Sequence, residues 1–126
     1  MRSGEEVARA FEALRDADAV LLIPGGRTSA HYRDIVQAAN ARRIPTIVHA
    51  RTASTADALL SYGASDAAVA RQAARLVDKI LKGENAGDLP IERPSKLELV
   101  INLKVAKALG LTLPPTLLAR ADRVIE

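Results

Sequence analysis

The residues best suited to chemistry follow a short apolar run near the start of the chain. They are Pro24, Gly25, Gly26, Arg27, Thr28 and Ser29. Glycines leave backbone N–H groups accessible, and a helix beginning at Thr28 or Ser29 with an arginine beside it suits a carboxylate or a phosphate. A plain turn from strand to helix explains the glycines equally well. The segment lacks both the Gly-Lys-Ser/Thr ending of a Walker loop and the spacing of a dinucleotide fingerprint.

A second group of polar side chains follows the next apolar run, at His49 and Arg51. The guanidinium of Arg51 can hold a carboxylate through two parallel hydrogen bonds. Arg51 as an ordinary solvated loop cation is the alternative, and the sequence leaves both open. Ser61 and Tyr62, at the end of a third apolar run, complete the candidate ligand-binding residues.

No catalytic constellation can be assembled from the sequence. His31 and His49 lack the spacing of a metal site, Ser61 does not stand in a GxSxG turn, and no two carboxylates are paired by spacing. The chain contains no cysteine, which excludes disulfides and thiolate chemistry. We therefore expect no enzyme, no metal site and no cofactor.

Apolar runs alternate with amphipathic segments and supply the frame for these residues. The pattern predicts strands at 20–23, 46–49, 59–62 and 97–101. It predicts helices at 4–15, from Thr28 or Ser29 to about Arg42, at 65–82, at 103–109 and after Pro114. Residues 51–60 are expected to form a loop with one helical turn, and residues 84–96 an extended segment.

This alternation predicts an α/β fold with a mainly parallel sheet. Ligands of such sheets bind beyond the carboxyl ends of the strands. Three loops should meet at that edge, namely 24–29, 49–52 and 62–65. Gly63 is expected to end the third strand, and Ser65, Gly83, Asn102 and Gly110 are expected to bound the helices beside them.

Length and composition limit the remaining possibilities. The 126 residues fit one domain, 1–126, and only 2% are aromatic, so the core must be aliphatic. The net charge of +3 comes from interleaved acidic and basic residues, and no basic run exceeds Arg42-Arg43, so we expect no nucleic-acid partner. The first residues show no signal peptide, and no apolar run is long enough to span a membrane.

The segment ILKGENAGDLPIERPSKLELVINLKVAKALGLTLPPTLLARADRVIE, with Leu59-Leu60-Ser61-Tyr62-Gly63 before it, resembles the C-terminal portion of substrate-binding proteins of ABC importers. The resemblance is to the branch with a periplasmic-binding-protein type I fold. It implies two α/β lobes around a ligand cleft, of which this chain resembles part of one. The sequence departs from that pattern at Ala58-Leu59, where relatives have paired glycines.

The resemblance implies a small-solute ligand, such as an amino acid, and an importer permease as partner. It places Ser61 near the hinge, takes helix 65–82 toward the other lobe and returns the chain at 97–101. It also implies a periplasmic or extracytoplasmic location, whereas the chain as given, without a signal peptide, would be cytoplasmic. The cleft would be only half built, as in a truncated binding protein or a stand-alone lobe.

Two functions from different classes therefore remain open. The first is a solute-binding module of an ABC transporter, and the alternative is a non-catalytic, oligomeric α/β interaction domain without a small ligand. The apolar stripe of helix 65–82, made of Val69, Ala73, Leu76, Val77, Ile80 and Leu81, needs a cover. It can fold back onto its own sheet or pair with a second copy, and we expect a homodimer.

Overall fold

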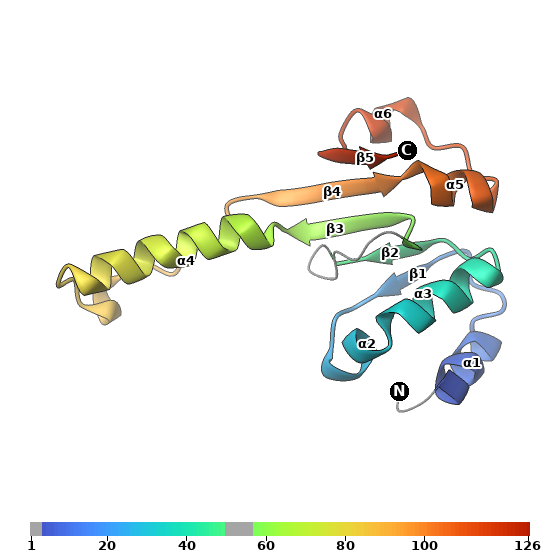
Figure 1. Ribbon diagram of the computed structural model, residues 1–126, viewed down its shortest axis with the longest axis horizontal. Helices are drawn as coiled ribbons and strands as arrows, with labels where there is room; N and C mark the ends of the chain where they lie inside the picture. The colour runs from blue at the N-terminus through green and yellow to red at the C-terminus, as the bar shows by residue number, and fades with distance from the viewer. Residues whose placement is uncertain (1–3, 50–56) are drawn as a thin grey trace.

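The computed structural model describes residues 4–49 and 57–126, which form an α/β body and a projecting arm (Figure 1). The strands are β1 (Val20–Leu22), β2 (Thr46–Val48), β3 (Leu60–Ala64), β4 (Leu97–Asn102) and β5 (Arg123–Ile125). The α-helices are α1 (Gly4–Ala13), α2 (Gly26–Ala30), α3 (Tyr32–Ala41), α4 (Asp66–Leu81), α5 (Leu103–Leu109) and α6 (Pro115–Leu118), and a 3-10 turn, η3, covers Ala86–Asp88.

The strands form one sheet in the order β1-β2-β3-β4-β5. β1, β2 and β3 are parallel, β4 is antiparallel to β3, and β5 is parallel to β4. The helices α2 and α3 connect β1 to β2, which is the kind of crossover that neighbouring parallel strands require. The predicted α/β fold with a mainly parallel sheet is therefore confirmed.

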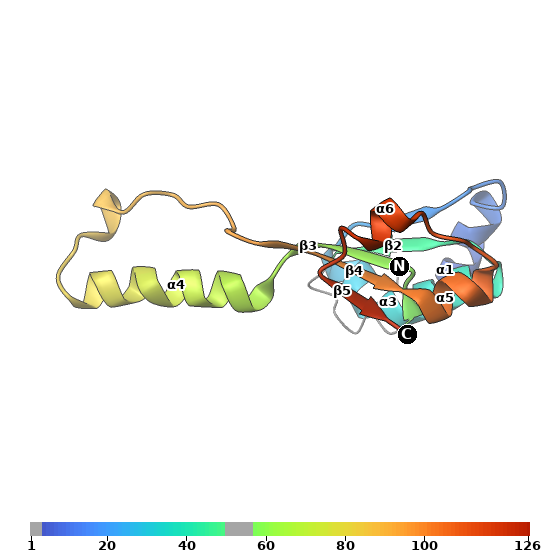
Figure 2. The same cartoon turned by 90° about the horizontal axis from the view of Figure 1, so that it is seen from above.

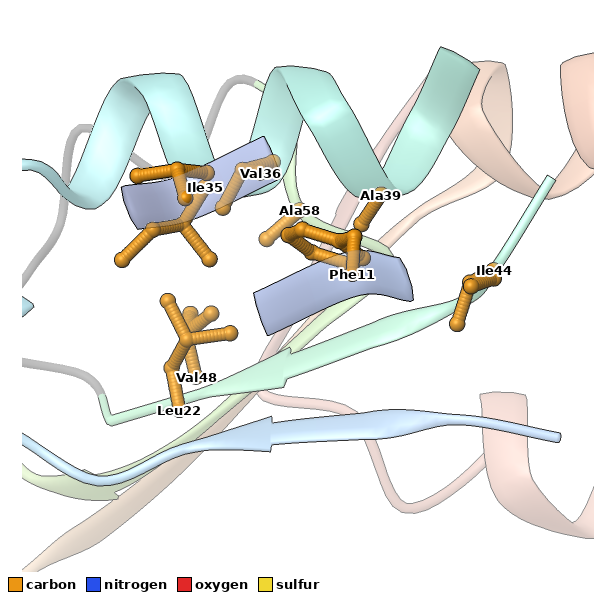
Figure 3. Packing of buried hydrophobic residues seen from close by; sticks show 9 residues of the cluster. Phe11, Leu22, Ile35, Val36, Ala39, Ile44, Val48 and Ala58 are labelled. Atoms are coloured by element: carbon orange, nitrogen blue, oxygen red, sulfur yellow. The ribbon is translucent and has the colours of Figure 1, made fainter. Parts of the chain in front are cut away.

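The hydrophobic core lies between the N-terminal strands and the helices α1 and α3 (Figure 3). It is aliphatic except for Phe11, whose ring lies 5.3 Å from the guanidinium carbon of Arg42. The buried members are Val7, Phe11, Leu22, Ile35, Val36, Ala39, Ile44, Val48 and Ala58. Ala58 belongs to the pair that departs from the family's glycines, and both it and Leu59 are buried, so these side chains add to the packing.

Most predicted bounds differ from the structure by one or two residues, and two predictions differ in kind. The helix expected from Thr28 or Ser29 to about Arg42 is two helices, because the chain leaves helical geometry at His31, where φ is −111° and ψ is 17°. The third strand does not end at Gly63, which lies inside β3 and pairs with Glu98. β4 supplies hydrogen-bond partners there that the local sequence does not reveal, and the pairing continues until the Ser65 N–H donates to the Lys96 carbonyl at 3.1 Å.

α4 and the segment that follows it form the arm, which extends away from the body (Figures 1 and 2). Gly83, with φ of 101°, ends the helix as predicted. The return segment, residues 84–96, contacts a polar row of α4. Gln72 Nε2 lies 2.6 Å from Glu92 Oε2, and Arg75 Nη2 lies 2.5 Å from the same oxygen. In the described part of the chain, no helix combines the length and the apolar character needed to cross a membrane.

The C-terminal segment packs beside β4. The Asn102 side chain accepts a hydrogen bond from the Val105 N–H at 3.2 Å, and Gly110 has φ of 73°, so the predicted cap and stop of α5 are confirmed. β5 was not predicted. Asp122 holds its start, because its carboxylate accepts from the Leu99 N–H and its own N–H donates to the Leu99 carbonyl, both at 2.9 Å.

Candidate functional site

Residues of loop 24–29 meet His49, the first residue of the predicted loop 49–52, in a small hollow at the carboxyl edge of the parallel strands. Leu22 lines it from the end of β1, Ile23 is the residue after β1, and His49 is the residue after β2. The remaining lining residues are Pro24, Thr28, Ser29 and Tyr32. Loop 24–29 and His49 are therefore brought together, as the strand-end rule for parallel sheets predicts.

The hydroxyl of Thr28 fixes the conformation of the first loop. Its Oγ1 donates toward the Ile23 carbonyl at 2.9 Å and lies 3.1 Å from the Gly25 carbonyl. The Ser29 N–H donates to the Gly25 carbonyl at 2.9 Å, which closes the first turn of α2. The single hydroxyl proton of Thr28 is used in a hydrogen bond within the loop. Thr28 therefore holds the loop that lines the hollow and is a poor hydrogen-bond donor to a ligand.

The glycines of the loop are not required by its backbone geometry. Gly25 has φ of −160°, which any residue adopts, and the positive-φ glycines of the described chain are Gly83 and Gly110. A Cβ on Gly26 would meet no atom within 4 Å. A tight turn therefore does not explain why residue 26 is a glycine. The open space beside its backbone leaves room for an approaching group. α2 has only five residues, so its dipole adds little.

The remaining candidate residues lie elsewhere. Ser61 is 2% exposed and pairs with Val48 and Val100 inside the sheet. Tyr62 is 53% exposed on the opposite face. Arg51 and the side chain of Arg27 lie outside the described residues.

The sequence missed Tyr32 as a lining residue of the hollow. Tyr32 shares one face of the helical period with Ile35, Val36 and Ala39, and it does pack against the core that contains those three residues. The break at His31 starts a new helix one residue later, which brings Tyr32 beside the loop. A helix break of this kind leaves no strong mark in the sequence, because His31 is neither glycine nor proline.

The hollow is too small to enclose a solute. Its volume is about 10 Å³, which is about the space of one water molecule. Small-molecule pockets have volumes of roughly 300–1,000 Å³. A solute at this edge would therefore rest on an open surface, and a second surface would have to close over it.

The other histidine of the chain lies outside the hollow. His31 does not line the hollow, and its Nδ1 lies 3.5 Å from Asp34 Oδ2 on its own helix. Residues 4–49 and 57–126 contain no group of three or more histidine and carboxylate side chains that could hold a metal ion.

Comparison with known proteins gives a consistent result. The model of a family described as ABC transporter substrate binding protein matches residues 2–125. No curated protein matches the chain. Among solved structures, a conserved domain protein from Vibrio cholerae O1 biovar El Tor is similar with a TM-score of 0.83 and 26% identity over 98% of this chain and 42% of its own.

Two further solved structures share the fold. An ABC domain in complex with L-Trp from Streptococcus pneumoniae has a TM-score of 0.81 and 23% identity over 99% of this chain and 44% of its own. The ligand-free, open structure of CD0873, a substrate-binding protein with adhesive properties from Clostridium difficile, has a TM-score of 0.72 and 20% identity over 99% and 42%. The chain thus spans less than half the length of each of these structures.

Proposed function

Because the chain belongs to the ABC transporter substrate-binding protein family, we propose that it is a small-solute-binding module of an ABC importer. The observation that carries the proposal is the family match over residues 2–125, which leaves almost none of the chain outside it. The loops that converge at the carboxyl edge of the sheet support it, since solute sites of parallel sheets lie at that edge.

The proposed ligand is an amino acid or a similar small anionic or zwitterionic solute. One structural neighbour is described in complex with L-Trp, which makes amino acids the first class to test. The proposed ligand-binding residues remain those of loop 24–29 together with His49, Arg51, Ser61 and Tyr62. Within this set, Pro24, Thr28, Ser29 and His49 line the hollow, which supports testing them first.

The family also suggests where and with what the chain acts. Its members are generally not enzymes and are typically extracytoplasmic or periplasmic. We extend both properties to this chain, with an importer permease as its partner and residues 1–126 as one α/β domain. The second surface that the open hollow needs would come from another α/β lobe or from a second copy, and a homodimer is part of the proposal.

A thermal-shift screen tests the proposed function. The chain is heated with each of the common amino acids, L-Trp included, and with small carboxylates. A ligand that binds only the folded state at 100 times its Kd adds about 2.7 kcal/mol of stability, which raises the melting temperature. If no compound in the panel raises the melting temperature at millimolar concentration, the chain alone is not a solute-binding module of this class.

Arg51 is tested separately once a ligand is found. Replacing Arg51 with Ala should remove roughly 1.5–3 kcal/mol of affinity, which is the usual contribution of a hydrogen bond to a charged group. The melting temperature without ligand should barely change, because the sequence predicts that Arg51 stands in a loop, where a cation contributes little to stability. Unchanged affinity by calorimetry would reject the carboxylate clamp while leaving the solute-binding proposal in place.

A further inference from the structure

The sheet narrows to two strands where the arm begins. β2 pairs with β3 as far as Ser61, and β5 pairs with β4 from Val100 onward. Between those residues and the arm, β3 and β4 pair only with each other among the described residues. We call this part of the sheet the connecting ribbon, and it consists of the pairs Tyr62–Leu99, Gly63–Glu98 and Ala64–Leu97.

The connecting ribbon is a weak support for the 16-residue helix α4. Isolated pairs of strands are marginally stable in water and twist more than wider sheets do. Gly63 lies in the middle of the ribbon, and a glycine weakens a strand because it has no side chain to pack. The arm points away from the body in both views, so α4 does not fold back onto its own sheet (Figures 1 and 2). The ribbon alone therefore fixes the direction of the arm only weakly.

Asp122 of the C-terminal segment contacts the connecting ribbon at both of its ends. Its N–H and its Oδ2 make two hydrogen bonds with the backbone of Leu99, at the end of the ribbon next to the body. Its other carboxylate oxygen, Oδ1, lies 3.7 Å from Nζ of Lys96. Lys96 is the last residue before β4, and its carbonyl accepts from the N–H of Ser65, where β3 passes into α4. One carboxylate thus joins the body to the base of the arm.

Side chains leave open space beside this contact. An open cleft of about 430 Å³ is lined by Asp66 and Ala67 from the first turn of α4 and by Asp122 and Arg123 at the start of β5. Lys96 lines the same cleft. The ion pair of Lys96 with Asp122 therefore links the base of the arm to the body at a place where close packing does not hold them together.

Glu98 forms a second ion pair with the same lysine. Its Oε1 lies 3.4 Å from Lys96 Nζ, which is closer than the Asp122 carboxylate. Glu98 is only two residues from Lys96 along the chain, so this pair joins no separate segments. The side chains of Lys96, Glu98 and Asp122 are all partly exposed, so both ion pairs are weak and sensitive to salt. A weak restraint is sufficient where the support itself bends easily.

We propose that the ion pair between Lys96 and Asp122 is a brace that restrains the direction of the arm relative to the body. With the ion pair formed, the arm samples a narrow range of directions. When salt screens the two charges, the connecting ribbon bends at Gly63 and the range widens. Lys96 and Asp122 are positioning residues in this device. The contact lies within one chain, so the inference requires neither a solute nor a second copy.

Pulsed electron spin resonance measures the range of arm directions as a distribution of distances between two spin labels. The labels are attached at Asp88→Cys on the arm and Ala108→Cys on α5, which are exposed positions in a chain without other cysteines. Asp122→Asn keeps an oxygen for the Leu99 N–H but loses the charge that attracts Lys96, so the distribution should widen. Lys96→Gln should widen it equally, and the double variant should widen it no further.

Glu98→Gln is the matched control, because it removes the shorter ion pair of the same lysine and should leave the width unchanged. Salt at about 1 M, where the Debye length is about 3 Å, should widen the distribution of the parent but not that of Lys96→Gln. Unchanged widths in Asp122→Asn and Lys96→Gln overturn the brace, and so does equal widening in Glu98→Gln. If Asp122→Asn fails to fold by circular dichroism, Lys96→Gln and the salt series decide, because neither removes the hydrogen bonds to Leu99.

Discussion

Two threonines in the body should respond in opposite ways to the same chemical change. Thr28 and Thr46 differ in what their hydroxyl groups contact. The Thr28 hydroxyl lies within hydrogen-bond distance of two backbone carbonyls of the first loop. The Thr46 side chain is fully buried in β2, and its Oγ1 finds no hydrogen-bond partner among the described residues. Valine has nearly the shape of threonine and lacks only the hydroxyl.

The magnitudes follow from what each hydroxyl contributes. A typical intramolecular hydrogen bond contributes about 0.5–1.5 kcal/mol net, so Thr28→Val should lower the free energy of unfolding by about 1 kcal/mol. A buried polar group without a partner costs about 1–3 kcal/mol, so Thr46→Val should be neutral or should raise the free energy of unfolding by about 1 kcal/mol. Valine also suits a central strand such as β2.

Urea unfolding at pH 7 measures both variants. The midpoint should fall for Thr28→Val and should stay or rise for Thr46→Val, with unchanged m-values. Thr28→Val should also weaken binding of any solute found in the thermal-shift screen, because the hydroxyl holds the loop that lines the hollow. If Thr46→Val destabilises as much as Thr28→Val does, the buried hydroxyl has a partner and the reasoning from burial is refuted.

Three further outcomes are expected. Ile101→Ala should lower the free energy of unfolding by about 2–5 kcal/mol because Ile101 is fully buried, whereas Ile91→Ala at a fully exposed position should leave the urea midpoint unchanged. Asn102→Ala should lower the free energy of unfolding by about 1 kcal/mol, because it removes the cap of α5. Asn102→Asp keeps a capping oxygen, so an equal or larger decrease in that variant would argue against the cap. The hydrogen bond from Gln72, together with the charge of Arg75, lowers the pKa of Glu92. The contact between Glu92 and α4 should therefore persist at neutral pH and be lost as the pH falls below the usual range of a glutamate. Hydrogen exchange of the return segment measures that loss, and a pH response that persists in Glu92→Gln would contradict it.

Local signals predicted much of the fold. The caps at Asn102, Gly83 and Gly110 and the apolar runs of β1, β2 and β4 are short-range features, and the structure has them close to where the sequence indicates. Long-range pairing was not predictable in the same way. β3 extends past Gly63 because β4 supplies its partners, and β5 forms by pairing with β4, beside the hydrogen bond between Asp122 and Leu99.

The candidate site was likewise predictable only in part. The rule for parallel sheets predicted that loop 24–29 and His49 would meet, because this depends only on strand direction. It could not predict that Tyr32 would join them, since that follows from the break at His31. Nor did it foresee that Ser61, paired on both sides by neighbouring strands, would be buried inside the sheet.

The arm also influences the order in which the chain folds. The contacts between α4 and its return segment join residues about 20 positions apart in the sequence. The pairing of β3 with β4 joins residues on either side of the whole arm, so it must close a longer loop. A helix forms within about a microsecond, and once α4 and its return segment are in place they shorten the free span between the two strands. We expect weakening of α4 to slow the pairing of β3 with β4 while leaving the unfolding rate of the body nearly unchanged, so that the element farthest from the core governs how fast the core closes.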